Sequence, residues 1–427
     1  MRARYCGLDF GTSNSTLGLS LEGRQLLCPL EGNSVTLPSA VFFDYEDHRV
    51  RYGRDAIVTY VDGADGRLLR SLKSVLGSQL INETTLIERR QVAMRAIIGM
   101  FMRQLKAIAE RHLAAEGIGG EIDSVVLGRP VRFVDDDDAA DRRAESELVD
   151  IARAQGFRHV ETQLEPIAAA LAYEQSLIKE EVSLIVDLGG GTSDFVIARL
   201  SPERAGRPDR TADILGRSGV HIGGTDFDRR LSIAQAMPHL GYHVLLGPKR
   251  LPMPVHLFHD LATWHKIPFL YTPQNLAYLQ SIVATADHPE LIRRLITVLA
   301  KRKGHQVAGE VESAKIALAE RDAAHLRLPL EPDIDIPLTS ADLDQAVQED
   351  SLQILHAIDR CAAMAGVELK QVQSIFLTGG STGIPAVRRA ILAHVPDARP
   401  VSGDMFGSVG LGLAIDAERR FGNISVA

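Results

Sequence analysis

Cysteine, long apolar runs and clusters of basic residues are all scarce in this chain. Only three of its 427 residues are cysteine, at positions 6, 28 and 361, and none belongs to the Cys-x-x-Cys pair typical of a metal site. This scarcity suits a reducing compartment. No apolar run is long and charge-free enough to span a bilayer, and the first predicted strand begins so early that it leaves no room for a signal sequence. We therefore expect a cytoplasmic protein that does not associate with membranes.

Charge and composition narrow the range of partners. The formal net charge is −8 and the isoelectric point is about 6.0. No block of lysine and arginine stands out, so nucleic acid is not an expected partner. Hydrophobic residues make up 45% of the chain. At this length they can build two or three domains, each with its own core.

One short motif is present twice. In each copy an apolar strand ends in an aspartate, Asp9 or Asp187, and a glycine turn with hydroxyl side chains follows. The turns are Gly11-Thr12-Ser13 and Gly189-Gly190-Gly191-Thr192, and a second strand-like run follows each, as in a β-hairpin. A glycine turn lets backbone N–H groups approach a phosphate closely, and the aspartate can hold a hydrated Mg²⁺. Two such turns facing each other would clamp a nucleotide between two lobes.

The rest of the pattern alternates strands and helices, which indicates an α/β fold. Residues 5–60 read as short strands with turns, 125–128 as a strand, and 202–210 as a loop. Apolar periodicity predicts helices over 86–115, 139–155, 164–173 and 305–320. Further glycine turns at 223–228 and 378–382 each open a helix, and a helix of small residues is expected within 404–416.

Five sequence blocks resemble the ATPase domain of the heat-shock protein 70 (DnaK) family, and they stand in the family's order. The blocks are Gly7–Ser13, Glu165–Tyr173, Asp187–Asp194, Gly223–Asp228 and Leu377–Pro385. The Glu-Pro-x-Ala-Ala-Ala-Leu-Ala-Tyr block separates this family from its actin and hexokinase relatives. Among its members the chain looks most like the YegD-type chaperones. The resemblance implies an actin-like ATPase fold, with two ribonuclease-H-like lobes around a nucleotide cleft and inserted helical subdomains.

The resemblance also implies a division of the chain. Residues 1–180 would form lobe I and 181–400 lobe II, with an inserted helical subdomain at about 230–325. Residues 401–427 would form a C-terminal helix that returns to lobe I. The sequence ends at Ala427, so we expect no hydrophobic linker and no peptide-binding domain.

Residue roles follow from the matched positions, with ATP or ADP and Mg²⁺ as the implied cofactors. Asp9 and Asp187 would orient Mg²⁺ through water, and Thr12, Ser13 and Thr192 would bond phosphate oxygens together with the backbone of both turns. Lys73 would neutralise charge on the γ-phosphate, and Glu165 would orient the attacking water. The remaining positions implied to contact the nucleotide are Gly223, Gly224, Glu312, Lys315, Gly379, Gly380, Ser381 and Asp404.

The chain departs from the family at three informative positions. Gly383 replaces an arginine that stacks on adenine in the family, and Ala319 replaces a serine near the base. Base contacts would therefore be weaker than phosphate contacts. Pro130 keeps the family's switch proline. The arginine eight positions after that proline, which relays nucleotide state to the peptide-binding domain, is Asp138 here.

Structural interpretations of the proposed catalytic residues remain open. The Asp9 turn could be an ordinary hairpin, and Asp187 could cap a strand end. Lys73 could be a solvated surface group, and Glu165 could favour a helix N-terminus through the macrodipole. Glu312 and Lys315 could form a surface ion pair worth only tenths of a kcal/mol.

Other residue clusters have a structural interpretation that we favour. The four acids Asp135–Asp138 resemble a metal cluster but precede a helix, where such residues act as caps. The histidines between 239 and 265 lack the regular spacing of a zinc site. Cys6 is interpreted as a small core residue.

Residues 237–300 carry apolar and aromatic residues among prolines. In the family, the corresponding subdomain binds nucleotide-exchange partners. We expect either a docking surface for a protein partner or co-chaperone, or an internal lid; alternatively these side chains pack a local core. The residues concerned are Leu257, Phe258, Trp264, Phe269, Leu270 and Tyr271.

Four functions remain open on the sequence alone. The first is an ATP-binding, slowly hydrolysing chaperone-like protein that consists of the nucleotide-binding domain. The second is a non-catalytic regulatory module that senses nucleotide. A filament-forming relative of actin is disfavoured by the Glu165 block. A small-molecule kinase of the same fold would need an acidic base aimed at a substrate hydroxyl.

Overall fold

The computed structural model describes residues 5–21, 23–134, 137–205, 207, 210–403 and 407–422. The chain forms two compact units. Unit 1 comprises Met1–Gly223, Gln353–Thr382 and Arg389–Ala427, and unit 2 comprises Gly224–Leu352 and Gly383–Arg388. Two helices, α12 (Gln348–Ala365) and α13 (Pro385–His394), continue from unit 2 into unit 1.

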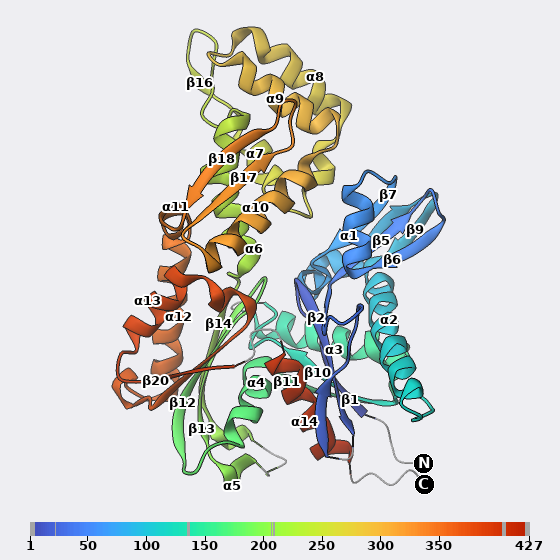
Figure 1. The fold of residues 1–427 in the computed structure, drawn as a ribbon, viewed down its shortest axis with the longest axis vertical. Coiled ribbons are helices and arrows are strands. Elements are labelled where there is room, and N and C mark those ends of the chain that lie inside the picture. The colour runs from blue at the N-terminus through green and yellow to red at the C-terminus, as the bar shows by residue number, and fades with distance from the viewer. Residues whose placement is uncertain are drawn as a thin grey trace. The chain divides into compact units, whose positions relative to one another are not determined.

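Unit 1 contains two large sheets (Figure 1). The first has the order β3-β2-β1-β10-β11, and β4 also pairs with β2. The second has the order β14-β13-β12-β19-β20. The strands of the first are β1 (Tyr5–Asp9), β2 (Asn14–Leu21), β3 (Arg24–Leu27), β4 (Thr36–Pro38), β10 (Ser124–Arg129) and β11 (His159–Leu164). Those of the second are β12 (Glu181–Leu188), β13 (Ser193–Leu200), β14 (Ile214–Val220), β19 (Ser374–Thr378) and β20 (Arg399–Ser402).

The two sheets have the same topology. In each sheet, three strands that follow one another form antiparallel pairs. A fourth strand then pairs in parallel with the first of them, and a fifth pairs in parallel with the fourth. The repeated motif therefore occupies the same place in both sheets, at the turn of the first hairpin. This duplication confirms the predicted fold class, an actin-like ATPase fold built from two ribonuclease-H-like units.

The remaining elements of unit 1 surround these sheets. A three-stranded sheet has the order β6-β5-β7, and β8 pairs with β9 in a hairpin. These strands are β5 (Ala40–Asp44), β6 (Arg49–Tyr52), β7 (Gly66–Arg70), β8 (Thr84–Ile87) and β9 (Arg90–Ala93). The helices are α1 (Gly53–Val61), α2 (Met94–Ala115), α3 (Asp138–Ala154), α4 (Glu165–Glu174), α5 (Pro202–Ala205) and α14 (Ser408–Phe421).

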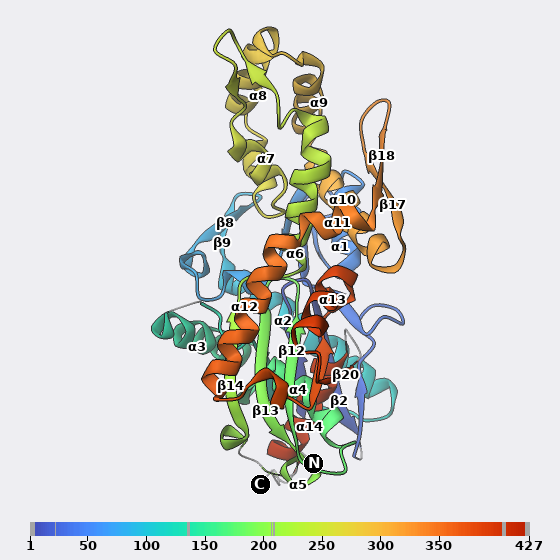
Figure 2. The same ribbon diagram turned by 90° about the vertical axis from the view of Figure 1, so that its left-hand side faces the viewer.

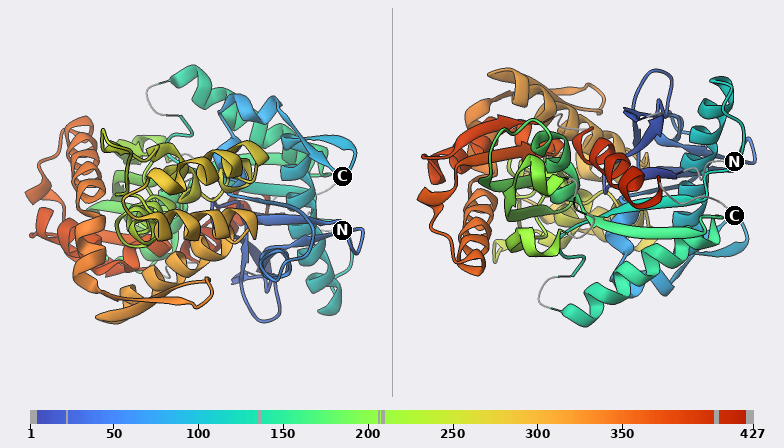
Figure 3. Two further views of the ribbon diagram at one scale, coloured as in Figure 1. Left: turned by 90° about the horizontal axis from the view of Figure 1, so that it is seen from above. Right: turned by 90° about the horizontal axis from the view of Figure 1, so that it is seen from below.

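Helix α14 packs against α4 and against strands β1 and β2 (Figure 3). Glycines lie at the closest of these contacts. A Cβ atom on Gly412 would lie 1.7 Å from the carbonyl oxygen of Ala168 in α4. A Cβ atom on Gly7 would lie 2.3 Å from the backbone carbon of Leu413. The small-residue pattern of the last predicted helix thus reflects backbone contact with both neighbours.

Unit 2 is mainly helical (Figure 2). Its helices are α6 (Gly224–Leu231), α7 (Val255–Leu261), α8 (Pro273–Ile282), α9 (Pro289–Ala300), α10 (Gly304–Glu320) and α11 (Ser340–Ala346). A π-helix, Ser232–Ala236, continues α6. Two hairpins complete the unit: β15 (Leu245–Leu246) with β16 (Leu251–Pro252), and β17 (Ala323–Leu328) with β18 (Ile334–Thr339).

Most predicted elements are present, but three predictions were wrong. The sequence predicts short strands with turns up to residue 60, but helix α1 occupies Gly53–Val61. The helix expected over 86–115 begins only at Met94, because Leu86 lies in the β8–β9 hairpin, whose turn places Glu88 at φ 53°. The loop expected over 202–210 opens with the short helix α5. The helices near 139–155, 164–173 and 305–320 are confirmed as α3, α4 and α10.

The aromatic segment 237–300 builds a local core in unit 2. Leu257, Phe258 and Leu270 are buried, whereas Phe269 is 67% exposed. The Trp264 ring lies edge-on to His305, with centroids 4.8 Å apart. The core interpretation therefore accounts for the three buried residues, and Phe269 is left as a candidate contact for a partner. Within the described ranges, no helix is both long and apolar enough to cross a membrane.

Candidate functional site

The two glycine turns of the repeated motif contact each other within unit 1. A Cβ atom on Gly190 would lie 2.0 Å from the Ser13 Oγ, and one on Gly191 would lie 3.1 Å from the Thr12 Oγ1. The second turn can therefore approach the hydroxyls of the first only as glycine. Side-chain hydroxyls and backbone N–H groups are thus concentrated where the hairpins β1–β2 and β12–β13 meet.

Two further glycine segments, at Gly379–Gly380 and at Gly223, lie against the second glycine turn. Gly379 has φ +83°, and a Cβ atom there would lie 2.6 Å from the Asp187 Oδ1. The Ser381 hydroxyl donates a hydrogen bond of 2.8 Å to the carbonyl oxygen of Gly189. Gly380 begins the short 3₁₀ turn Gly380–Gly383. A Cβ atom on Gly223 would lie 2.6 Å from the Gly191 nitrogen.

Lys73 and Glu165 form a buried ion pair in unit 1. Lys73 lies in the 3₁₀ helix Leu72–Val75, and its Nζ donates a short hydrogen bond to the Oε1 of Glu165, the first residue of α4. Burial lowers the pKa of Lys73, but Glu165 and Asp9 outweigh it, and the net shift is upward. The raised pKa favours the positively charged form of Lys73, and its burial means that it is not a solvated surface group.

Three aspartates share this enclosed region with the ion pair. Burial, reinforced by the charge of Glu165, raises the pKa of Asp9 to about 7 and that of Asp194 to about 7. The same causes raise the pKa of Asp187 well above its usual value, and Asp194 and Asp9 contribute to that increase. Four carboxyl groups are therefore grouped around a single lysine, and each ionised carboxylate makes ionisation of its neighbours less favourable.

Asp194 belongs to this cluster although the sequence reading did not select it as a site residue. Its Oδ1 accepts a hydrogen bond of 2.7 Å from the Val131 nitrogen, and its carboxyl group interacts with the Thr192 hydroxyl. The available signal was its place at the end of the second motif block, opposite Asp187 in the β12–β13 register. Hairpin pairing alone brings the two aspartates together.

The carboxylate cluster fits a hydrated Mg²⁺. Buried carboxyl groups with raised pKa values gain stability when a cation offsets their charge. In the described part of the chain, no group of three His, Cys, Asp or Glu side chains could hold a metal directly. Contact through water, with Asp9 and Asp187 as the anchoring carboxylates, fits this donor set, because Mg²⁺ keeps several waters when bound.

The raised pKa values predict how the stability of the metal-free protein depends on pH. Asp194 has a folded pKa of about 7, against roughly 3.9 when unfolded. Between these values the folded state binds more protons, so stability should fall as pH rises from about 4 to about 7, on the order of a few kcal/mol. Urea denaturation in EDTA at pH 5 and pH 7.5 would measure the fall.

Asp194→Asn provides the matched comparison for this pH dependence. The asparagine keeps an oxygen to accept the Val131 N–H bond, but it does not titrate. The variant should therefore lose less stability than the parent protein between the two pH values. Equal losses in the two proteins would show that Asp194 ionises normally.

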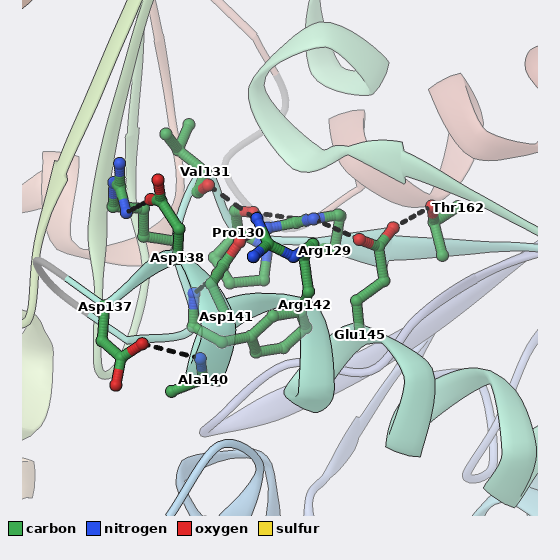
Figure 4. A network of polar contacts seen from close by, with 12 residues as sticks. Arg129, Pro130, Val131, Asp137, Asp138, Ala140, Asp141, Arg142, Glu145 and Thr162 are labelled. Atoms are coloured by element: carbon green, nitrogen blue, oxygen red, sulfur yellow. Dashed lines mark hydrogen bonds and ion pairs between the residues drawn. The ribbon is translucent and has the colours of Figure 1, made fainter.

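The Asp194 carboxylate accepts a hydrogen bond from the Val131 nitrogen. Val131 in turn belongs to a network of polar contacts around Pro130 (Figure 4). Arg129 donates hydrogen bonds to the carbonyl oxygens of Pro130 and Val131 and to the carboxylates of Asp141 and Glu145 on α3. The segment 129–131 is thereby fixed to α3.

The acidic run before α3 has capping and pairing roles. The Asp137 side chain accepts hydrogen bonds from the nitrogens of Ala139 and Ala140, which confirms the predicted N-terminal cap. Asp138, which replaces the family arginine, pairs with Arg132 at 2.7 Å. Asp135, Asp136 and the predicted nucleotide contact Asp404 lie outside the described residues.

The other predicted nucleotide contacts belong to unit 2. Lys315 forms an ion pair of 2.8 Å with Asp228 and donates a hydrogen bond to the carbonyl oxygen of Gly224. It thereby fixes α10 to the beginning of α6. Glu312 lies one turn earlier on α10. The roles of Gly224, Glu312 and Lys315 towards ribose and base stay predictions.

Comparison with known proteins agrees with this architecture. The Hsp70 protein family model matches residues 5–236, a little over half of the chain. The chain is 26% identical to the chaperone protein HscA of Klebsiella pneumoniae subsp. pneumoniae and of Salmonella typhimurium, over 440 residues in each case. It is also 26% identical to HscA of Citrobacter koseri over 441 residues.

These alignments cover 99% of this chain but only 59% of each HscA protein. The chain thus spans about three fifths of the length of the relatives it matches. The range matched by the family model contains both copies of the aspartate–glycine motif and the positions of Lys73 and Glu165. The chain belongs to the Hsp70 protein family.

Proposed function

We propose that this protein binds ATP and hydrolyses it slowly, as a chaperone-like ATPase of the Hsp70 family. The observation that carries the proposal is the buried Lys73–Glu165 pair among Asp9, Asp187 and Asp194, beside two glycine turns in contact. Phosphoryl transfer depends mainly on positioning and charge neutralisation. This cluster supplies both within one compact unit.

Each residue has a defined part in the proposed reaction. The backbone of Gly189–Gly191, with the hydroxyls of Thr12, Ser13 and Thr192, would bind the phosphate oxygens. Lys73 would offset the negative charge that develops on the γ-phosphate. Glu165 holds the lysine in place and would orient the attacking water. Asp194, with a pKa of about 7, could accept the proton of that water near neutral pH.

Asp9 and Asp187 would hold Mg²⁺ through water, and the ion would supply charge neutralisation for the phosphates. Nucleotide binding would favour a closed arrangement, and hydrolysis would release it for a partner acting in trans. That partner would be a protein or co-chaperone bound at the 237–300 segment, where Phe269 is exposed.

A non-catalytic nucleotide sensor is the second candidate. Gly383, Ala319 and Asp138 replace residues that in the family contact the base or relay nucleotide state. The ion pair of Asp138 with Arg132 gives this third position a different local role. In that case ATP would stabilise one arrangement of the protein without being hydrolysed.

The experiment that separates these candidates is ATP turnover with Mg²⁺, with nucleotide affinity measured on the same samples. We expect slow turnover in the parent protein and a fall of about a hundredfold or more in Asp187→Asn, because the variant loses a charge that orients the cation. Asp397→Asn, which removes an exposed carboxylate of the same unit, serves as the control. Tight binding without turnover in the parent would support the sensor.

A further inference from the structure

Unit 2 contains a cavity that the ATPase proposal does not use. Its volume is about 440 Å³, within the range of small-molecule sites. Arg229 of α6, His259 of α7 and Gln345 of α11 contribute polar side chains to its lining, and Gln348 and Leu352 of α12 complete it on another side.

The cavity offers many hydrogen-bond donors with few partners. The Arg229 guanidinium makes one long contact, 3.5 Å from its Nη2 to the Oδ1 of Asp226. Among the described residues, the His259 ring nitrogens and the side-chain amides of Gln345 and Gln348 form no hydrogen bond. Arginine and amide donors grouped in this way suit a ligand that presents acceptor oxygens.

The neighbouring Arg230 has a different role, because its charge is already matched. Its Nη2 lies 2.8 Å from the Oδ1 of the buried Asp350, and its Nη1 lies 2.9 Å from Glu349. These bonds join α6 to the beginning of α12 and hold one wall of the cavity in place. Arg229 is therefore the cationic side chain available to a ligand.

The cavity also has an apolar wall, and part of that wall is an irregular helix. Ile233 and Ala234 line the cavity from the π-helix Ser232–Ala236. Short π-helical segments are rare and are frequent at functional sites. Pro238 lies just after the segment and lacks the N–H group that would continue a regular α-helix. Leu352, which is 53% exposed, extends the apolar surface.

We propose that this cavity binds a small organic carboxylate, with its anionic group on Arg229 and its carbon chain against the π-helix. The guanidinium fork matches a carboxylate, and the free amides complete the set of donors. The apolar wall would contact the aliphatic part of the ligand. This assignment is independent of ATP binding.

The position of the cavity gives ligand binding a mechanical consequence. α6 begins directly after the chain enters unit 2 at Gly224, and α12 leaves unit 2 after Leu352. A ligand held between Arg229 and Gln348 would tie together the two helices that lead to and from unit 2. Amide hydrogen exchange in these helices should slow when the ligand is bound.

Hexanoate is a suitable probe, with 1-hexanol and hexylamine as neutral and cationic controls of the same chain length. Binding would be measured by ligand-observed NMR without nucleotide. Because a hydrogen bond to a charged group is worth more than a neutral one, we expect hexanoate to bind about tenfold more tightly than hexanol. Arg229→Gln should remove that preference, and Arg229→Lys should retain part of it.

Arg293→Gln is the matched control, because Arg293 is an exposed arginine of α9 outside the cavity. It should leave hexanoate binding unchanged. Hydrogen exchange with the parent protein should show protection over residues 224–236 and 345–352. Equal binding of hexanoate and hexanol, no binding of either, or full binding by Arg229→Gln would overturn the assignment.

Discussion

Replacing Lys73 with alanine is expected to lower ATP turnover by about a hundredfold to a thousandfold, while nucleotide affinity changes only a few-fold. Lys73 is the one cation found within the cluster formed by Asp9, Glu165, Asp187 and Asp194 in the described structure. Without it, the described residues of this cluster supply no cationic side chain to offset charge on the transferring phosphoryl group. Removing a preorganised electrostatic contact of this kind costs roughly 3 to 4 kcal/mol of transition-state stabilisation.

The affinity for ATP should be largely retained in Lys73→Ala, because binding depends on atoms other than the lysine Nζ. The phosphates would contact backbone N–H groups of the glycine turns and the hydroxyls of Thr12 and Ser13, which Lys73 does not hold in place. Single-turnover kinetics and equilibrium titration of ATP would separate the two effects. Lys370→Ala, at an exposed lysine of unit 1 that pairs with Glu368, should change neither.

Two other results would count against this role of Lys73. Equal losses of turnover and affinity would mean that Lys73 acts mainly in binding. Unchanged turnover would assign Lys73 a structural role, as the partner that makes burial of Glu165 tolerable. The melting temperature should be recorded beside the kinetics, because removing one partner leaves the buried Glu165 charge uncompensated.

Sequence reasoning went furthest where function requires particular short motifs. A glycine turn after a strand-end aspartate is a short motif in which few residue types are possible. Asp9, Asp187 and both turns could therefore be identified directly from the sequence. The duplicated sheet topology follows from the same motif, because each copy opens a hairpin of identical connectivity. The Hsp70 family assignment rested on the order of these blocks, and the family comparison confirms it.

Sequence reasoning failed where the deciding contacts are tertiary. Asp194 enters the carboxylate cluster only through strand pairing with Asp187. Leu86 fits a helical period, but a two-residue turn places it in a hairpin. The free donors of Arg229 become visible only when α6, α7, α11 and α12 are assembled around the cavity. No local pattern records contacts of this kind.

Replacing Gly412 with alanine is expected to destabilise unit 1 by about 3 kcal/mol or more. The added Cβ would lie 1.7 Å from the carbonyl oxygen of Ala168 and 2.3 Å from its carbonyl carbon. Both are backbone atoms of α4, so no side chain can rotate away and the helices must separate. Overpacking of this kind typically costs about 1 to 3 kcal/mol, and rigid neighbours place it at the upper end. Urea denaturation followed by circular dichroism would measure the loss.

Gly99→Ala is the matched control, because Gly99 also lies inside a helix of unit 1. Its added Cβ would meet the end of the Gln155 side chain at 2.6 Å. That side chain can move, and alanine is favoured over glycine in a helix by about 1 kcal/mol, so this variant should be close to neutral. If both variants were equally stable, the backbone contact of α14 with α4 would not limit the stability of unit 1.

Because α4 begins at Glu165, separation of α4 from α14 should also disturb the Lys73–Glu165 pair. Gly412→Ala should therefore lose turnover under conditions where it is still folded, which would link the contact between α14 and α4 to the proposed chemistry.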